Sequence, residues 1–165
     1  MTVLDVTKDT DARTMTITAR FDAPVTAVWE VWSDPRKLER WWGPPTYPAT
    51  VVEHELTPGG TVTYFMTGPE GDRHHGWWRV RAVEPPGFLE FEDGFADEAG
   101  NADPAMPTTV TRVTLAEAAG GTEMQIRSAF PTTEAMERML AMGMEAGITA
   151  SVGQIDELVA AHEVG

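Results

Sequence analysis

The sequence predicts an α+β fold in which a single antiparallel sheet curls around one long C-terminal helix. Between about residues 48 and 129, segments that alternate apolar with polar residues are separated by turns rich in glycine and proline, as in a meandering antiparallel sheet. Residues 133–161 instead carry apolar side chains at helical spacing. This segment is long enough to form a helix that covers the sheet.

The predicted domain begins with a strand followed by two short helices. Residues 14–21, T-M-T-I-T-A-R-F, alternate polar and apolar side chains, the pattern of a half-buried strand. Pro24 opens the first helix, because a proline in the first turn lacks only an N–H that would be unpaired there. Asp34 caps a second helix over residues 35–41, and Pro44-Pro45 ends it. The apolar positions of the first helix are Val25, Val28, Trp29 and Trp32.

Six further strands follow, most of them joined by compact turns. We expect them at about residues 48–57, 60–67, 73–84, 87–94, 108–117 and 121–129. The turns carry Pro58-Gly59-Gly60, Gly68 to Gly71, Pro85-Pro86-Gly87 and Gly120-Gly121. The segment 95–107 is a longer connection, and connections of more than about 12 residues are usually functional or disordered.

The composition indicates one folded domain. The chain has 165 residues and carries no repeat or linker of biased composition, so we expect a single domain over residues 13–165. The polar residues 1–12 are expected to form a loose N-terminal segment. Because no basic and apolar leader is present, and no apolar run approaches the ~18 residues of a membrane span, we expect a cytoplasmic protein.

Charge and cysteine content exclude several classes of partner and chemistry. The chain has 26 acidic and 12 basic residues, a net charge of −14, which repels the phosphates of nucleic acids and anionic membrane surfaces. We therefore expect neither nucleic acid nor membrane as a partner. The absence of cysteine rules out disulfides and thiolate chemistry.

Alternation along the strands predicts which side chains face the helix. The inward set is Val52, His54, Leu56, Val62, Tyr64, Met66, Trp78, Val80, Ala82, Leu89, Phe91, Val113, Leu115, Met124 and Ile126. On the outer face, Glu90 and Glu92 would be cross-strand partners of Arg79 and Arg81. Trp77 shares that outer face, where a contact between two copies of the chain, a homodimer, is one interpretation.

The predicted C-terminal helix has two chemically different halves. Its first half contains four methionines together with Gly143 and Gly147, whereas its second half contains branched aliphatic residues. Methionine adapts to irregular surfaces, and a glycine inside a helix costs about 1 kcal/mol relative to alanine. The first half therefore fits the wall of a cavity, and an ordinary methionine-rich core is the alternative. The methionines are Met136, Met139, Met142 and Met144.

Several short motifs occur in an order that resembles a known family. They are Phe21-Asp22-Ala23-Pro24 with Val28-Trp29, Trp32-Ser33-Asp34-Pro35, Trp41-Trp42-Gly43-Pro44, Leu56 to Gly60, Pro85-Pro86 with Leu89, and Thr111 to Thr114. Over about residues 14–160 they resemble the activator of heat-shock protein 90 ATPase homologues, a family of the START-like (SRPBCC) superfamily. The resemblance implies a helix-grip fold, in which a curved antiparallel sheet wraps around a long C-terminal helix and encloses a hydrophobic cavity.

The chain departs from the family pattern at three positions. Thr57 stands where an arginine is common, His54 where an aromatic residue is common, and Ile148 where a tryptophan often follows the helix glycine. The differences at His54 and Ile148 enlarge or polarise the cavity. The ligand of a relative is therefore not carried over to this chain.

The implied fold places ten residues in the cavity wall. They are Trp42, His54, Tyr64, Met66, Trp78, Phe91, Phe95, Met136, Met139 and Gly143. Apolar walls with a few polar groups suit a small-molecule pocket, and the loop 95–107 is placed to cover its entrance. Trp29, Trp32 and Trp41 are assigned to core packing. The spacing of His54, His74, His75 and His162 fits no metal-binding helix motif, so we expect no metal and no cofactor.

Three functions remain open from the sequence. The first is a noncatalytic START-like domain that binds a small hydrophobic or aromatic ligand, as a sensor, carrier or stress-related regulator. The second is a cyclase, dehydratase or hydrolase on a lipophilic substrate. It would use His54 as a base, because burial among apolar walls favours the neutral imidazole, and Tyr64 is the other candidate for proton transfer. The third, a module that stimulates a chaperone ATPase, rests on the family name alone.

Overall fold

The computed structural model describes residues 3–164, with side chains described for residues 5–159. In this part of the chain, eight antiparallel strands form one sheet in the order β1-β2-β8-β7-β6-β5-β4-β3. The strands are β1 (Val3–Asp9), β2 (Thr14–Phe21), β3 (Ala49–His54), β4 (Thr61–Thr67), β5 (Arg73–Glu84), β6 (Phe88–Ala96), β7 (Thr109–Ala118) and β8 (Gly121–Ala129). The helices are α1 (Val25–Ser33), α2 (Pro35–Trp41), α3 (Thr133–Ala141), α4 (Met144–Val152) and α5 (Ile155–Val164).

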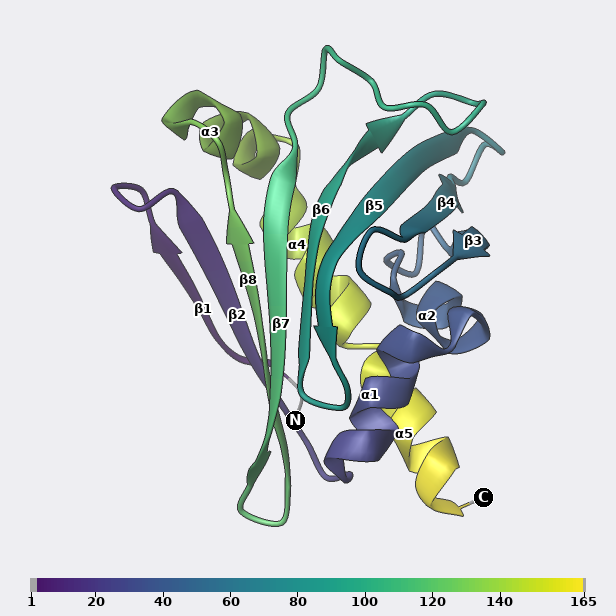
Figure 1. Cartoon of the computed structure of the whole chain (residues 1–165), viewed down its shortest axis with the longest axis vertical. Coiled ribbons are helices and arrows are strands. Elements are labelled where there is room, and N and C mark those ends of the chain that lie inside the picture. Colours follow the sequence, from purple (N-terminus) through teal and green to yellow (C-terminus); the bar gives the residue numbers. More distant parts are fainter. Residues whose placement is uncertain (1–2, 165) are drawn as a thin grey trace.

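The sheet curves around the C-terminal helical segment, which confirms the predicted α+β architecture (Figure 1). From β3 to β8 each strand pairs with the next strand in the chain, and β2 pairs with β8. In Figure 1, α4 lies behind the central strands and α5 lies beside α1. The hydrophobic core therefore lies between the inward face of the sheet and these helices.

The N-terminal segment forms an edge strand. β1 pairs antiparallel with β2, Val6 packs against the core, and Lys8 Nζ lies 2.5 Å from Oε1 of Glu145 on α4. The expectation of a loose segment over residues 1–12 is therefore wrong for residues 3–9. The edge of β2 that faces away from β8 supplies the backbone hydrogen bonds that this short polar segment cannot make alone. Residues 1 and 2 lie outside the described residues.

The two short helices start and join through local interactions. Oδ1 of Asp34 accepts a hydrogen bond of 2.9 Å from the backbone amide two residues later, which confirms the predicted cap of α2. Trp41 Nε1 donates to the carbonyl of Val31 at 2.8 Å and so joins α2 to α1. Trp29, Trp32 and Trp41 are all buried, in agreement with their assignment to core packing.

The C-terminal helical segment is interrupted twice, whereas its periodicity predicts one uninterrupted helix. Gly143 separates α3 from α4 with a φ of +87°, a left-handed conformation that glycine adopts without strain. At the second interruption, the side-chain amide of Gln154 donates to the carbonyl of Gly43 at 2.7 Å. This bond fastens the α4–α5 junction to the segment that follows α2. Apolar spacing continues through both interruptions, so it does not reveal them.

Aromatic rings fill the core next to the short helices. Trp78 stacks on Phe91 with ring centroids 3.9 Å apart, and Trp42 meets Trp78 edge to face at 4.8 Å. Trp32 meets Trp41 edge to face at 4.7 Å. Each such pair contributes about 0.5–1.5 kcal/mol beyond the burial of its surface. The cluster fixes Trp42 in position at the end of the core.

Two β-bulges change which side chains face inward. The register of β3 shifts between Val51 and Glu53, so Val51 is buried while Val52, predicted to face inward, is 63% exposed. The register of β5 shifts between Val80 and Ala82, and Ala82 therefore leaves the inward face on which it was expected. An extra residue in one strand reverses the alternation of all residues after it.

The outer face of the sheet carries charges and one partly covered tryptophan. Arg79 is the register partner of Glu92, in agreement with the predicted cross-strand pairs, whereas the bulge in β5 places Ala82 instead of Arg81 opposite Glu90. Nε of Arg112 donates to Oε1 of Glu90 at 2.8 Å. Trp77 lies on this face, and its Nε1 donates to the carbonyl of Phe95 at 3.0 Å. The indole N–H of Trp77 is thus hydrogen-bonded within the chain. A homodimer contact at this residue stays a prediction.

Candidate functional site

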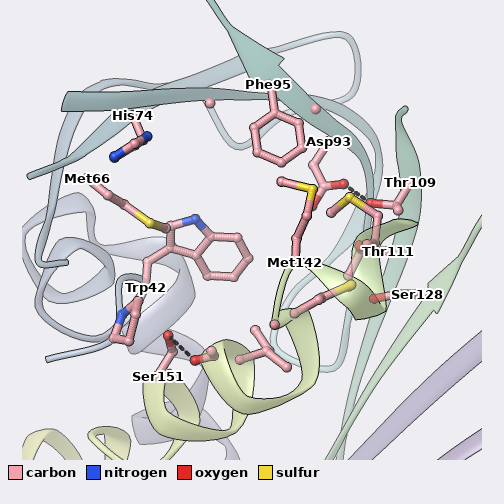
Figure 2. Close-up of a pocket in the computed structure, with 18 of the residues that line it drawn as sticks. Trp42, Met66, His74, Asp93, Phe95, Thr109, Thr111, Ser128, Met142 and Ser151 are labelled. Atoms are coloured by element: carbon pink, nitrogen blue, oxygen red, sulfur yellow. Dashed lines mark hydrogen bonds between the residues drawn. The ribbon is translucent and has the colours of Figure 1, made fainter. Parts of the chain in front are cut away.

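A pocket of about 330 Å³ lies between the inward face of the sheet and the α3–α4 segment (Figure 2). Strands β4 to β8 supply the sheet wall. The facing wall comes from α3, α4 and the turn between them, and the residues after α2 border the pocket at one side. The pocket is therefore built by segments that range from Trp42 to Ser151 along the chain.

Six of the ten predicted lining residues border this pocket. They are Trp42, Tyr64, Met66, Phe95, Met139 and Gly143. Trp78 and Phe91 share the inward face of the sheet, but they stack on each other and are fully buried. Met136 is also fully buried, on α3. These three side chains therefore belong to the packed core rather than to the pocket wall.

His54 lies outside the pocket because its ring is engaged elsewhere. Its Nε2 lies 3.1 Å from the carbonyl oxygen of Trp32. Since a carbonyl oxygen only accepts, Nε2 is the donor in this bond. The contact ties the end of β3 to α1. The geometry gives no support to His54 as a base acting on a molecule in the pocket.

The helical wall of the pocket is rich in methionine. Met139, Met142 and Met144 all border it, and Met142 is 54% exposed, which places it at the rim. In an unbroken helix Met144 would stand about 140° around the axis from Met139, at 3.6 residues per turn. The left-handed turn at Gly143 instead allows all three to border one cavity. Their unbranched thioether side chains can adapt to the shape of a bound molecule.

Polar side chains gather on three neighbouring strands at one part of the pocket. Asp93 on β6 is the register partner of Thr109 on β7, and Thr111 on β7 is the partner of Ser128 on β8. The hydroxyl of Thr109 donates to Oδ1 of Asp93, as the dashed line in Figure 2 shows. The two threonines and the serine are buried. Four oxygen-bearing side chains thus share a surface that is otherwise apolar.

Sequence reasoning missed Asp93, although a signal for it exists. The alternation that places Leu89 and Phe91 inward also places Asp93 inward, two residues further along the same strand. In a chain with 26 acidic residues, one more carboxylate close to a loop does not stand out. Thr109, Thr111 and Ser128 follow the same rule in β7 and β8 and were likewise absent from the predicted wall.

The surroundings of Asp93 favour its neutral form. Burial raises the pKa of this carboxyl to about 7; the hydrogen bond from Thr109 opposes the rise, and the charge of Glu92 adds to it. Among the described residues that border the pocket, none is a lysine or an arginine. The carboxyl is therefore close to the midpoint of its titration at neutral pH.

Tyr64 and Trp42 bring polar groups to the other part of the pocket. The Tyr64 ring lies directly over Gly76, where an added Cβ would come within 2.4 Å of its hydroxyl oxygen. Burial, and secondly the charge of Asp93, raise the pKa of Tyr64, so its hydroxyl keeps its proton. Nε1 of Trp42 is buried and makes no hydrogen bond of regular geometry within the described residues. Both side chains are therefore hydrogen-bond donors near neutral pH.

The loop that follows β6 borders the pocket at one residue, Pro107. Arg138 on α3 fastens the loop, because its guanidinium donates to the carbonyl of Ala105 at 3.3 Å. The segment 95–107 was expected to cover the entrance. The structure shows it at the pocket border and attached to the helical wall.

The described residues offer no evident metal site. Within residues 5–159, no three histidine, aspartate or glutamate side chains gather into a group that could hold a metal ion. His74 pairs with Asp72 at 2.5 Å on the surface, and this hydrogen bond is the main cause that lowers the pKa of Asp72. The side chain of His162 lies outside the described residues. No helix in the described part of the chain has the length and apolar character needed to cross a bilayer.

The curved sheet, the two short helices after β2 and the C-terminal helices define a START-like protein with the helix-grip fold. The chain belongs to the activator of Hsp90 ATPase homolog 1-like family, whose model matches residues 22–160. This finding confirms the family predicted from the sequence motifs. A search of the curated proteins finds no match.

Solved structures of similar proteins agree with this assignment. A crystal structure of a protein from Mycobacterium smegmatis is 46% identical, with a TM-score of 0.89, and the match covers 95% of this chain and 96% of that one. A solution NMR structure of a protein from Arthrobacter aurescens is 47% identical, with a TM-score of 0.92 and coverage of 96% and 92%. The AHSA1 protein from Silicibacter pomeroyi shares the fold at 22% identity, with a TM-score of 0.72 and coverage of 90% and 99%.

Proposed function

We propose that the protein is a noncatalytic binding domain, a sensor, carrier or stress-related regulator, which holds a small hydrophobic or aromatic molecule in the pocket. The observation that carries the proposal is the pocket itself, with a volume of about 330 Å³ and walls of tryptophan, phenylalanine and methionine. Pockets for small molecules typically measure about 300–1,000 Å³ and are mostly apolar with a few polar groups. The methionines of the helical wall would adjust to the bound molecule.

The hydrogen bonds of His54, His74 and Ser151 support a noncatalytic role. Ser151 Oγ donates to the carbonyl of Gly147 inside α4 at 3.0 Å, His54 is bonded to Trp32, and His74 is paired with Asp72. Each of these groups has a structural partner. The enzymatic alternative therefore lacks the base it named. The chaperone-stimulating alternative stays a prediction that rests on the family name.

Titration with the neutral apolar dye N-phenyl-1-naphthylamine tests the proposal. The dye fluoresces when it leaves water, and we expect saturable binding to the wild-type protein. Met139→Trp places an indole where a thioether borders the pocket, so it should weaken binding at least tenfold because the cavity is filled. The dye should be recovered chemically unchanged after prolonged incubation.

A matched control separates pocket filling from a general effect of tryptophan. Val52→Trp adds the same indole at a position that is 63% exposed and does not border the pocket, so its dye affinity should equal that of the wild type. Urea unfolding would show that both variants remain folded. An unchanged affinity in Met139→Trp would contradict the proposed binding site.

A further inference from the structure

The pocket is chemically divided into an aromatic part and an oxygen-rich part. Figure 2 shows the Trp42 ring facing the cavity from the side on which Met66 also lies. Across the cavity lie Asp93, Thr109, Thr111 and Ser128, next to Phe95. A molecule that fills the pocket therefore meets flat apolar surfaces at one end and oxygen atoms at the other.

Asp93 is the principal acceptor of the oxygen-rich part. A carboxylate can accept about four hydrogen bonds. The Thr109 hydroxyl donates to Oδ1, and backbone hydrogen bonds from Thr109 and from Asp93 itself also contribute. Asp93 also borders the cavity. Burial of a carboxylate is unfavourable unless a positive group or several donors accompany it, and within residues 5–159 no ion pair is made by Asp93. The described part of the chain thus leaves the Asp93 carboxyl at the pocket without an ion-pair partner.

The ionisable groups near Asp93 include no lysine or arginine among the described residues that line the pocket. Tyr64 on β4 is neutral or negative, and Glu92 on β6 is acidic. From β5, His74 and His75 border the pocket, and His74 is already paired with Asp72 at 2.5 Å. The lining contributed by β7, β8, α3 and α4 contains no ionisable side chain among the described residues.

We propose that the pocket selects an amphiphilic amine, whose ammonium group binds Asp93 while its aromatic or other apolar body lies against Trp42, Met66 and Phe95. This inference rests on the proposed binding function and deepens it by naming the ligand class. The ammonium supplies a permanent cation, which none of the described lining residues does, and charge-assisted hydrogen bonds of this kind are about twice as strong as neutral ones. Aromatic rings also attract cations through their faces. The net charge of −14 raises the local concentration of cations at the protein surface.

A matched pair of compounds tests the inference. 2-(2-Naphthyl)ethylamine and 2-(2-naphthyl)ethanol share their aromatic body, and only the first carries an ammonium, since alkylamines titrate near pH 10 like lysine. Calorimetric titrations at pH 8 and 150 mM salt, where the Debye length is about 8 Å, limit attraction by distant surface charges. We expect the amine to bind the wild-type protein at least tenfold more tightly than the alcohol.

Two variants locate the selectivity. Asp93→Asn keeps the side-chain shape and removes the charge, so it should weaken the amine at least tenfold and leave the alcohol within about twofold of the wild type. Glu98→Gln removes an exposed carboxylate from the loop after β6 and should change neither affinity. The comparison of amine and alcohol on the wild-type protein is decisive even if a variant does not fold.

The outcomes distinguish this inference from the proposed function. Equal affinities for amine and alcohol, or equal weakening of both by Asp93→Asn, would overturn the inference while leaving a pocket that binds apolar molecules. If neither compound bound, the inference would also fall, and the dye titration with Met139→Trp would decide the proposed function separately. A third outcome would also overturn the inference. If the preference for the amine were lost in Glu98→Gln and kept in Asp93→Asn, the selectivity would belong to the protein surface.

Discussion

Replacing Asp93 by asparagine should stabilise the protein, and the gain should grow as the pH rises. Burial raises the pKa of this carboxyl from its ordinary value of 3.8 to about 7. One pKa unit corresponds to about 1.4 kcal/mol, so a rise of about three units corresponds to at most about 4 kcal/mol of destabilisation above pH 7. Asparagine has nearly the same shape and no charge, and it avoids this penalty.

The direction follows from proton binding. Between about pH 4 and pH 7 the native carboxyl retains a proton that the unfolded chain releases, so the free energy of unfolding falls as the pH rises through this range. Above pH 7 the contribution of Asp93 to the free energy of unfolding is constant. Between pH 5.5 and pH 8 the wild-type protein should therefore lose about 2 kcal/mol relative to Asp93→Asn.

Urea unfolding at pH 5.5 and pH 8, followed by tryptophan fluorescence, measures this difference. Effects of all other titrating groups are common to the two proteins and cancel in the comparison. Glu98→Gln, which removes an exposed carboxylate of the neighbouring loop, serves as the matched control, and its difference from the wild type should stay constant with pH. The reasoning is refuted if the difference between Asp93→Asn and the wild type changes by less than about 0.5 kcal/mol, the error of such comparisons.

Two further substitutions test the geometry of the pocket. Gly76→Ala should destabilise the protein by about 1–3 kcal/mol, as overpacking does, because the added Cβ would come within 2.4 Å of Tyr64. Urea unfolding measures this loss, and an unchanged stability would mean that Tyr64 moves freely. Thr109→Val should raise the pKa of Asp93 above about 7, because it removes the hydroxyl that donates to the carboxylate. Carboxyl carbon chemical shifts measured against pH would report the rise, and an unaltered titration midpoint would contradict the role of this hydrogen bond.

The strand and short-helix pattern of this chain is readable from its sequence because each element obeys one local rule. β2, β5, β8 and α2 begin and end at the predicted residues. Strict alternation defines β2, and the capping aspartate and the two prolines define α2. Such signals act within a few residues and need no information on the rest of the fold.

The differences from prediction arise where distant segments decide the outcome. β1 is a strand because it pairs with the edge of β2 that faces away from β8. Val52 faces outward because a bulge adds one residue to β3, and alternation carries no mark of a bulge. The turn at Gly143 occurs inside a continuous apolar stripe, so the periodicity of the helix conceals it.

The pocket was predictable in its apolar part and not in its polar part. Aromatic and methionine residues that were predicted to face inward, such as Tyr64, Met66 and Met139, do border it. His54 attracted attention as a titratable residue among apolar neighbours, but its partner is a carbonyl on α1, which only the tertiary structure reveals. Asp93 lies on the inward face as alternation requires, and what makes it distinctive, a partly buried position opposite Thr109, depends on the pairing of two strands.

A crystal structure of the protein with 2-(2-naphthyl)ethylamine tests the central claim most directly. We expect the naphthyl ring between Trp42 and Phe95 and the ammonium nitrogen at about 2.7–2.9 Å from a carboxylate oxygen of Asp93, the usual length of such a bond. An amine bound on the outer face of the sheet, or one in the pocket with its nitrogen directed away from Asp93, would contradict the account.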